Sequence, residues 1–210
     1  MTLITKNNKN LIKGFSLVEL LVAVSIFSII AVVAMGALYS VQNANTKTQQ
    51  AQVILDGMNL SMEQMVRDIR YGSIFHCDNV IPTINNISSA PFFNRADCVF
   101  PASSGNVLVF KPSNSLISTD RISYYLSNGS IMKLDPKVSS SGVQITSNDV
   151  KIKTLNFFVE GTNSSQAVPA DYDQPLITIV ISGVTIQSKV GVAPVKFSLQ
   201  TSVSARLLDN

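Results

Sequence analysis

The hydrophobic and polar positions of the chain follow three patterns in succession. From Phe15 to Val41 the residues are apolar, apart from Glu19 and a few Ser, Gly and Tyr residues. From residue 43 to residue 71, apolar residues recur every three or four positions, and after residue 107 they alternate with polar residues in short runs. Because the first spacing is typical of helices and the second of strands, the sequence predicts an α+β fold.

The apolar segment is long enough to cross a membrane. Its 27 positions from Phe15 to Val41 make a helix of about 40 Å, whereas the hydrocarbon core is about 30 Å thick. Lys6, Lys9 and Lys13 precede it, and an uncharged polar stretch follows it. Positive charge before the span predicts a cytoplasmic N-terminus, residues 15–42 as a single membrane span, and a C-terminal domain outside the cytoplasm.

The helical period continues beyond the membrane segment. One apolar stripe runs through residues 43–71, with polar residues on the other faces. We therefore predict one helix from Phe15 to Tyr71, whose second half is amphipathic and covers a β-sheet. The predicted stripe consists of Ala51, Leu55, Met58, Met62, Met65 and Ile69.

Residues 72–106 contain Pro82, Pro91 and Pro101 with runs of Asn and Ser, which predicts a connecting loop of turns. The loop holds the two cysteines of the chain, Cys77 and Cys98. Outside the cytoplasm such a pair favours a disulfide, which stabilises the fold by about 3 kcal/mol on the loop-entropy estimate. A zinc site that includes His76 is the alternative, but zinc needs three or four ligands.

Residues 107–210 read as an antiparallel β-domain. Asn128-Gly129 lies between two of the alternating runs and is a strong hairpin signal. The predicted strands are 107–111, 121–126, 130–134, 151–160, 176–182 and 195–206.

The net positive charge of the chain lies entirely in its N-terminal segment. The 210 residues carry a formal net charge of +3, and the three lysines of the first 13 residues account for all of it. The 13 remaining Lys and Arg residues balance the 13 Asp and Glu residues. No basic stripe with interleaved aromatic residues is present, so the sequence gives no indication of nucleic-acid binding.

Glu19 and Gly14 point to processing of the N-terminus. An ionised carboxylate at the bilayer centre costs about 2.5 to 3.5 kcal/mol, so Glu19 needs a partner. Cleavage after Gly14 would leave the apolar helix on the mature protein and create a free amine at Phe15, which carries the opposite charge. The alternatives are an uncleaved signal anchor and a Glu19 side chain that reaches the interface.

The segment Lys13-Gly14-Phe15-Ser16-Leu17-Val18-Glu19-Leu20-Leu21 resembles the class III signal of type IV prepilins and type II secretion pseudopilins. The resemblance implies that a prepilin peptidase removes residues 1–14 after Gly14 and methylates the new amine of Phe15. It also implies that Glu19 meets the N-terminal amine of a neighbouring subunit in a filament and sets its register.

The order of elements is similar to the pilin fold. The length, and cysteines that directly follow the helix, resemble a PilW-type minor pilin or the larger J-type pseudopilin more than a major pilin. The expected function is that of a minor pilin that initiates or caps a type IV pilus. The expected partners are the prepilin peptidase, other minor and major pilins or pseudopilins, and the inner-membrane assembly platform. The alternatives are a type II secretion pseudopilin, and an adhesin or DNA-uptake module displayed on the pilus.

Signals of catalysis are few. The chain has one histidine, His76, and neither a phosphate-binding glycine loop nor a paired-carboxylate motif. We therefore expect no enzyme, no cofactor and no metal. Asp171-Tyr172-Asp173 offers oxygens to calcium, but a solvated acidic turn is the simpler interpretation.

Overall fold

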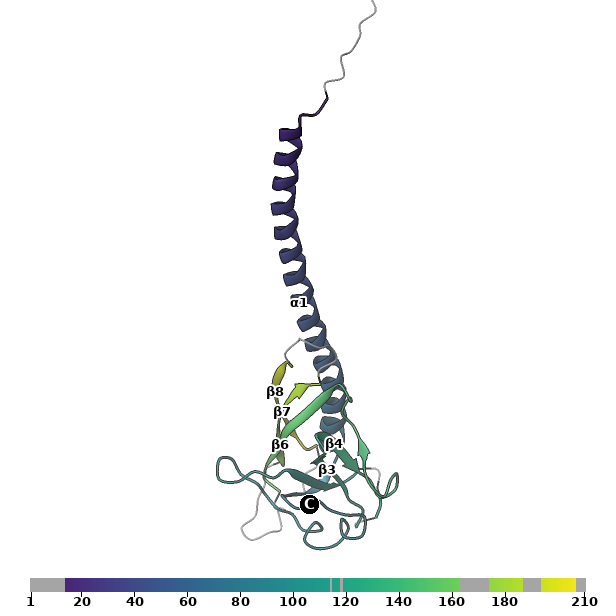
Figure 1. Ribbon diagram of the computed structural model, residues 1–210. Coiled ribbons are helices and arrows are strands. Elements are labelled where there is room, and N and C mark those ends of the chain that lie inside the picture. The colour runs from purple at the N-terminus through teal and green to yellow at the C-terminus, as the bar shows by residue number, and fades with distance from the viewer. Residues whose placement is uncertain (1–13, 114, 118, 163–173, 187–193, 207–210) are drawn as a thin grey trace, which may run out of the picture. The chain divides into compact units, whose positions relative to one another are not determined.

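The computed structural model describes residues 14–113, 115–117, 119–162, 174–186 and 194–206. The chain divides into two compact units, residues 1–46 and residues 47–210. Figure 1 shows one long helix and a set of strands. These elements are α1 Leu17–Arg70, β1 Ser73–Asp78, β2 Val107–Lys111, β3 Ile122–Ser127, β4 Ser130–Leu134, β5 Val143–Gln144, β6 Val150–Glu160, β7 Leu176–Thr185 and β8 Lys196–Ser204.

The predicted α+β class with antiparallel strands is confirmed, and the arrangement is consistent with the pilin fold. The strands form two sheets, one in the order β1-β2-β3-β4-β5 and the other in the order β6-β7-β8. Isolated bridges join Cys98 to Val159 and Gly105 to Phe157, so the segment before β2 runs beside strand β6. This segment links the two sheets because its backbone pairs with β6.

Most predicted elements match the structure closely. The helix was expected from Phe15 to Tyr71 and runs from Leu17 to Arg70. The hairpin at Asn128-Gly129 is present, and both of its residues have the positive φ that the turn requires. Strands β2 and β4 have the predicted bounds. Local pattern was sufficient here because each element carries its own period and its own turn signals.

Strand β1 is a correction to the loop expected over residues 72–106. It pairs with β2 and buries Phe75 and Cys77. The sequence did not reveal this strand because its pairing register shifts between Ser73 and His76, and Ile74 lies at a φ of 55°. The irregularity breaks the alternation by which a strand is recognised.

Within the domain, helix α1 buries a stripe that differs in part from the predicted one. Met58, Met65 and Ile69 are fully buried as expected, but Leu55 is 51% exposed and Ile54 takes its place in the core. The hydroxyl of Ser61 is buried in the same stripe and donates a hydrogen bond of 2.6 Å to the carbonyl of Ile145. The contact face is therefore rotated slightly from the one that hydrophobicity alone indicates.

The disulfide lies in the core of the domain. Cys77 and Cys98 are bonded, with their Cα atoms 5.8 Å apart and both residues buried. Gly105 packs directly against the Sγ atom of Cys77, and a side chain there would also lie 2.7 Å from the carbonyl oxygen of Asp78. The bond therefore fixes β1 against the segment that pairs with β6.

A polar cluster joins the last turns of α1 to the first sheet. The carboxylate of Asp68 accepts hydrogen bonds of 2.6 Å from the hydroxyl of Tyr124 and from the ammonium of Lys133. Burial, together with this hydrogen bond to Asp68, raises the pKa of Tyr124 well above its usual range. Tyr124 therefore stays protonated and serves as a donor.

Removal of the acceptor should destabilise the domain. Asp68→Ala leaves the buried Tyr124 hydroxyl and the half-buried Lys133 ammonium without their partner, so we expect a loss of about 1 to 3 kcal/mol. Thermal unfolding of the full chain in detergent micelles measures this change. Asp68→Asn is the matched control, because it keeps an acceptor for Tyr124 and should lose less. Equal stability of Asp68→Ala and the parent would contradict the assignment.

Candidate processing and assembly site

The predicted junction lies at the start of helix α1. Gly14 and Phe15 precede the helix, and Glu19 is in its first turn. The amide of Glu19 donates a hydrogen bond of 3.2 Å to the Ser16 hydroxyl oxygen, and the amide of Leu20 donates one of 3.2 Å to the Ser16 carbonyl. Ser16 is therefore the N-cap, and Glu19 stands three residues after it.

Ser16 is the residue that the sequence analysis missed. The spacing Ser16-x-x-Glu19 is that of a capping box, in which the serine side chain accepts from the third amide of the helix. This pattern was visible in the sequence and marks where the helix begins. A carboxylate in the first turn is also favoured by the helix dipole, so Glu19 is compatible with helix initiation as well as with assembly.

The glycine at position 14 has no structural cause within the described residues. A Cβ atom added there would meet no atom within 4 Å, and Phe15 is 74% exposed. The described packing would accept a larger residue at position 14. A requirement for glycine would then come from an outside molecule that must approach the backbone closely, as a peptidase does.

The apolar part of α1 is uncovered. Large hydrophobic side chains from Phe15 to Val41 are 51% to 76% exposed, and the most apolar window has a mean hydropathy of 2.7 with none of it buried. The helix is long and apolar enough to cross a membrane. A continuous surface of this kind requires lipid or other apolar helices around it.

Two serine hydroxyl groups within this segment donate hydrogen bonds to the helix itself. Ser25 donates a hydrogen bond of 2.8 Å to the carbonyl of Val22, and Ser28 donates one of 2.8 Å to the carbonyl of Val24. Such internal bonds reduce the cost of a hydroxyl in hydrocarbon. Within the described residues the Glu19 carboxylate has no hydrogen-bond or ion-pair partner, so it is a charged group of this segment that still needs one.

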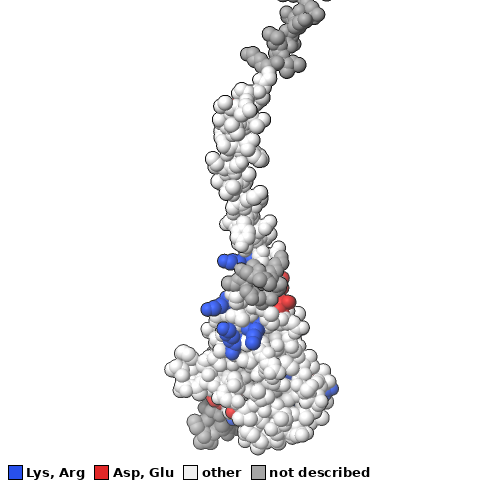
Figure 2. Space-filling model, viewed as in Figure 1, with Lys and Arg blue, Asp and Glu red and all other residues white. Residues whose placement is uncertain are grey.

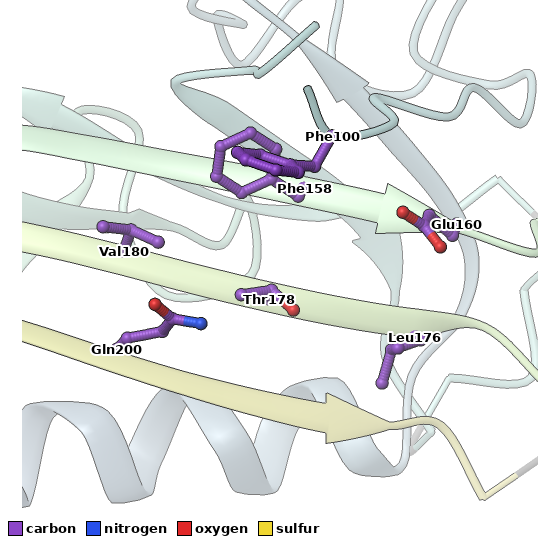
Figure 3. Close-up of a pocket in the computed structure, with 7 residues that line it drawn as sticks. All are labelled: Phe100, Phe158, Glu160, Leu176, Thr178, Val180 and Gln200. Carbon is purple, nitrogen blue, oxygen red and sulfur yellow. The ribbon is translucent and has the colours of Figure 1, made fainter. Parts of the chain in front are cut away.

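A pocket of about 280 Å³ lies on the three-stranded sheet, on the face that Figure 3 shows. The rings of Phe100 and Phe158 form one wall, with centroids 5.3 Å apart and planes at 80°. Glu160 lies at one end in Figure 3 and Gln200 on the β8 side. The remaining lining residues are Leu176, Thr178 and Val180.

The described residues hold no arrangement typical of catalysis. The pocket has one carboxylate and no histidine, so it lacks an acid–base pair. His76 is buried with Nδ1 2.8 Å from the carbonyl oxygen of Asn94, and its neighbour Cys77 is oxidised in the disulfide. No group of three potential metal ligands occurs in the described part of the chain, and Asp171 and Asp173 lie outside it.

Comparison with known proteins gives one match. A family model described as the prokaryotic N-terminal methylation motif matches residues 9–35. Neither the curated proteins nor the solved structures that were compared contain a significant match. The motif implies processing by a prepilin peptidase and assembly with other pilins, and it fits a single-pass membrane-anchored protein together with the apolar helix. Residues 9–35 are therefore the class III signal peptide of type IV prepilin-like proteins, and they support a type IV pilin-like or pseudopilin protein.

Proposed function

We propose that the chain is a minor pilin of a type IV pilus, a structural subunit without enzymatic activity. A prepilin peptidase cleaves it after Gly14 and methylates the amine of Phe15. Residues 15–42 then anchor it in the inner membrane with its domain in the periplasm. From there it enters a filament together with other minor and major pilins, and it initiates or caps that filament.

The observation that carries the proposal is the uncovered apolar segment with one carboxylate at its start. Seventeen large hydrophobic side chains from Phe15 to Val41 are exposed, and the hydroxyls of Ser25 and Ser28 between them are bonded to their own helix. A bilayer first, and then the apolar helices of neighbouring subunits, would cover this surface. Glu19 is compatible with both environments only if it finds a positive charge.

The free amine of Phe15 in another subunit is the natural partner of Glu19. Two opposite charges 4 Å apart interact by about 4 kcal/mol at an effective dielectric constant of 20, which exceeds the same contact in water about fourfold. Desolvation offsets part of this gain, so the pair acts mainly on register and choice of neighbour. A subunit that is one helical turn out of place would leave both charges unpaired in an apolar filament core.

The domain supports a minor rather than a major subunit. The disulfide between Cys77 and Cys98 comes directly after α1, whereas major pilins commonly carry theirs toward the C-terminus. Gly36 is the residue available for a bend in the membrane half, where many major pilins have proline, and a Cβ atom there would meet no described atom within 4 Å. These two departures from the common major-pilin pattern support the proposal of a minor subunit.

Cleavage predicts a defined mature mass. Protein purified from cell membranes should begin at Phe15 and carry one added methyl group, because the proposed peptidase cuts after Gly14 and methylates the new amine of Phe15. Intact-mass spectrometry measures both changes. Gly14→Ala is the control, since it blocks close approach of the backbone and should leave the leader in place. Protein that retains Met1 in the wild-type strain would contradict the cleavage.

Glu19→Ala should insert and be processed but should be lost from sheared filaments. Glu19→Gln separates the two roles of the residue, because it keeps a polar side chain at the third helical position and removes the charge. If the charge sets the register, Glu19→Gln fails like Glu19→Ala, while Ser16→Ala, which weakens the helix start by about 1 kcal/mol, is still incorporated. Immunoblots of sheared filaments and of membranes measure incorporation and insertion. Normal incorporation of Glu19→Gln would remove the electrostatic role.

Deletion of the protein tests the pilus assignment against type II secretion. We expect a deletion strain to lose surface pili and to secrete folded exoproteins normally, because the subunit starts the pilus. Electron microscopy of the cell surface and activity assays of the culture medium give the two readouts. The reverse phenotype would identify a pseudopilin, and normal piliation with lost adhesion or DNA uptake would identify a display module.

A further inference from the structure

The part of α1 that belongs to the domain runs from Lys47 to Arg70. One end of the three-stranded sheet lies near the first turns of this part, and the other end lies near its last turns. A Cβ atom at Gly57 would lie 3.2 Å from the Cβ of Ser147, so the segment before β6 packs beside this part of the helix. At the opposite end, the amide of Arg206 donates a hydrogen bond of 2.8 Å to the carbonyl of Arg70. Strand β8 therefore begins at the end nearer Lys47, which we call the Lys47 end, and finishes beside Arg70.

Lysines from separate strands gather at the Lys47 end. Val184 of β7 pairs with Lys151 of β6 on one side and with Lys196 of β8 on the other, so these two lysines share one row of the sheet. Lys153 follows at the irregularity between Ile152 and Thr154. Because neighbouring strands are about 4.8 Å apart, Lys151 and Lys196 are separated by about 10 Å.

The charge of this sheet is polarised along its strands. Three exposed lysines lie in the first residues of β6 and β8, whereas Glu160 is the last residue of β6 and pairs with Leu176 at the opposite end. Lys47 is exposed as well, and among the described residues Asp56 and Asp149 are the exposed acidic residues near the Lys47 end. Figure 2 shows a group of basic side chains gathered on the domain, with acidic side chains beside it. The four lysines therefore outnumber the two acids where the domain joins the membrane segment.

We propose that the Lys47 end of the domain, through Lys47, Lys151, Lys153 and Lys196, binds the anionic phospholipid headgroups of the membrane that anchors the chain. The proposal rests on the anchoring of residues 15–42 stated above. Lys47 lies five positions after Gln42, and even a fully extended chain of that length spans about 17 Å at most. Lys47 therefore stays within about 17 Å of Gln42 whatever angle the two units adopt. The lysines of β6 and β8 lie at the same end of the domain as Lys47.

The charge of the surface selects this partner. Fields of exposed lysines decay over about 8 to 10 Å at physiological salt, so these lysines attract the headgroups when this end of the domain lies within about that distance of the membrane surface. Anionic headgroups attract each lysine near the surface, and several together hold a domain against the membrane. The contact keeps the domain in a fixed orientation while the subunit is in the membrane. The contact ends when the subunit is extracted from the membrane.

Lysine labelling tests the proposal on the full chain. The protein is reconstituted into vesicles of neutral phosphatidylcholine, or of phosphatidylcholine with about 30 mol% phosphatidylglycerol, and treated with a neutral amine-acylating reagent. Mass spectrometry should show labelling of Lys47, Lys151, Lys153 and Lys196 about threefold slower or more in the anionic vesicles. About 0.5 M salt should restore the rate. Lys111 and Lys137 are internal controls with unchanged rates.

A second readout uses matched variants. A fluorophore on Ser198→Cys, two residues beyond Lys196 on β8, should be quenched by spin-labelled headgroups in the anionic vesicles; the native cysteines are in the disulfide and do not react. The triple variant K151Q/K153Q/K196Q should lose this quenching, whereas K111Q/K137Q should keep it.

The outcomes separate the inference from the function on which it rests. Equal labelling and quenching in both kinds of vesicle, with a chain that resists carbonate extraction, would overturn headgroup binding and leave the membrane anchor intact. A chain that carbonate extracts would contradict the anchor, and headgroup binding with it.

Discussion

An apolar surface that its own unit does not cover is the constraint on which the rest of this structure depends. From Phe15 to Val41 the side chains of α1 are exposed, and hydroxyls within the segment are bonded to the helix itself. Transfer of such a surface from water to lipid or to other helices yields about 25 cal/mol per Å², a large driving force over 27 residues. The segment therefore requires a membrane or an assembly, and the proposed processing site precedes it.

The start of this helix combines two demands in few residues. Ser16 caps the helix through the amide of Glu19, and the Glu19 side chain remains for a partner outside the described residues. No described contact requires glycine at position 14. A requirement for glycine there would come from another molecule that approaches the backbone closely. A capped helix start with an unpaired Glu19 carboxylate fits the proposed function, in which the subunit moves from a bilayer into a filament.

The domain supplies rigidity by different means. The disulfide from Cys77 to Cys98 fixes the first strand against the segment that bridges to β6, and Asp68 ties the end of α1 to Tyr124 and Lys133 of the first sheet. Both contacts connect residues that are far apart in sequence. They stabilise the end of the domain opposite the Lys47 end. The lysines of β6 and β8 therefore project from a rigid sheet, and residues 42–47 connect this sheet to the apolar segment.

The sequence by itself determined the features that are encoded locally: the long helix, most of the strands, the hairpin at Asn128-Gly129 and the methylation motif of residues 9–35. Each of these carries its own period, turn residues or motif within a short window. Tertiary structure alone decided that Ile54 and not Leu55 enters the core, that the loop over residues 72–106 begins with a strand, and that the strands divide into two sheets. It also decided that lysines distant in sequence share one end of a sheet. These features depend on contacts between segments that are distant in sequence. The hydrophobic pattern of one segment alone does not determine the free energy of such contacts.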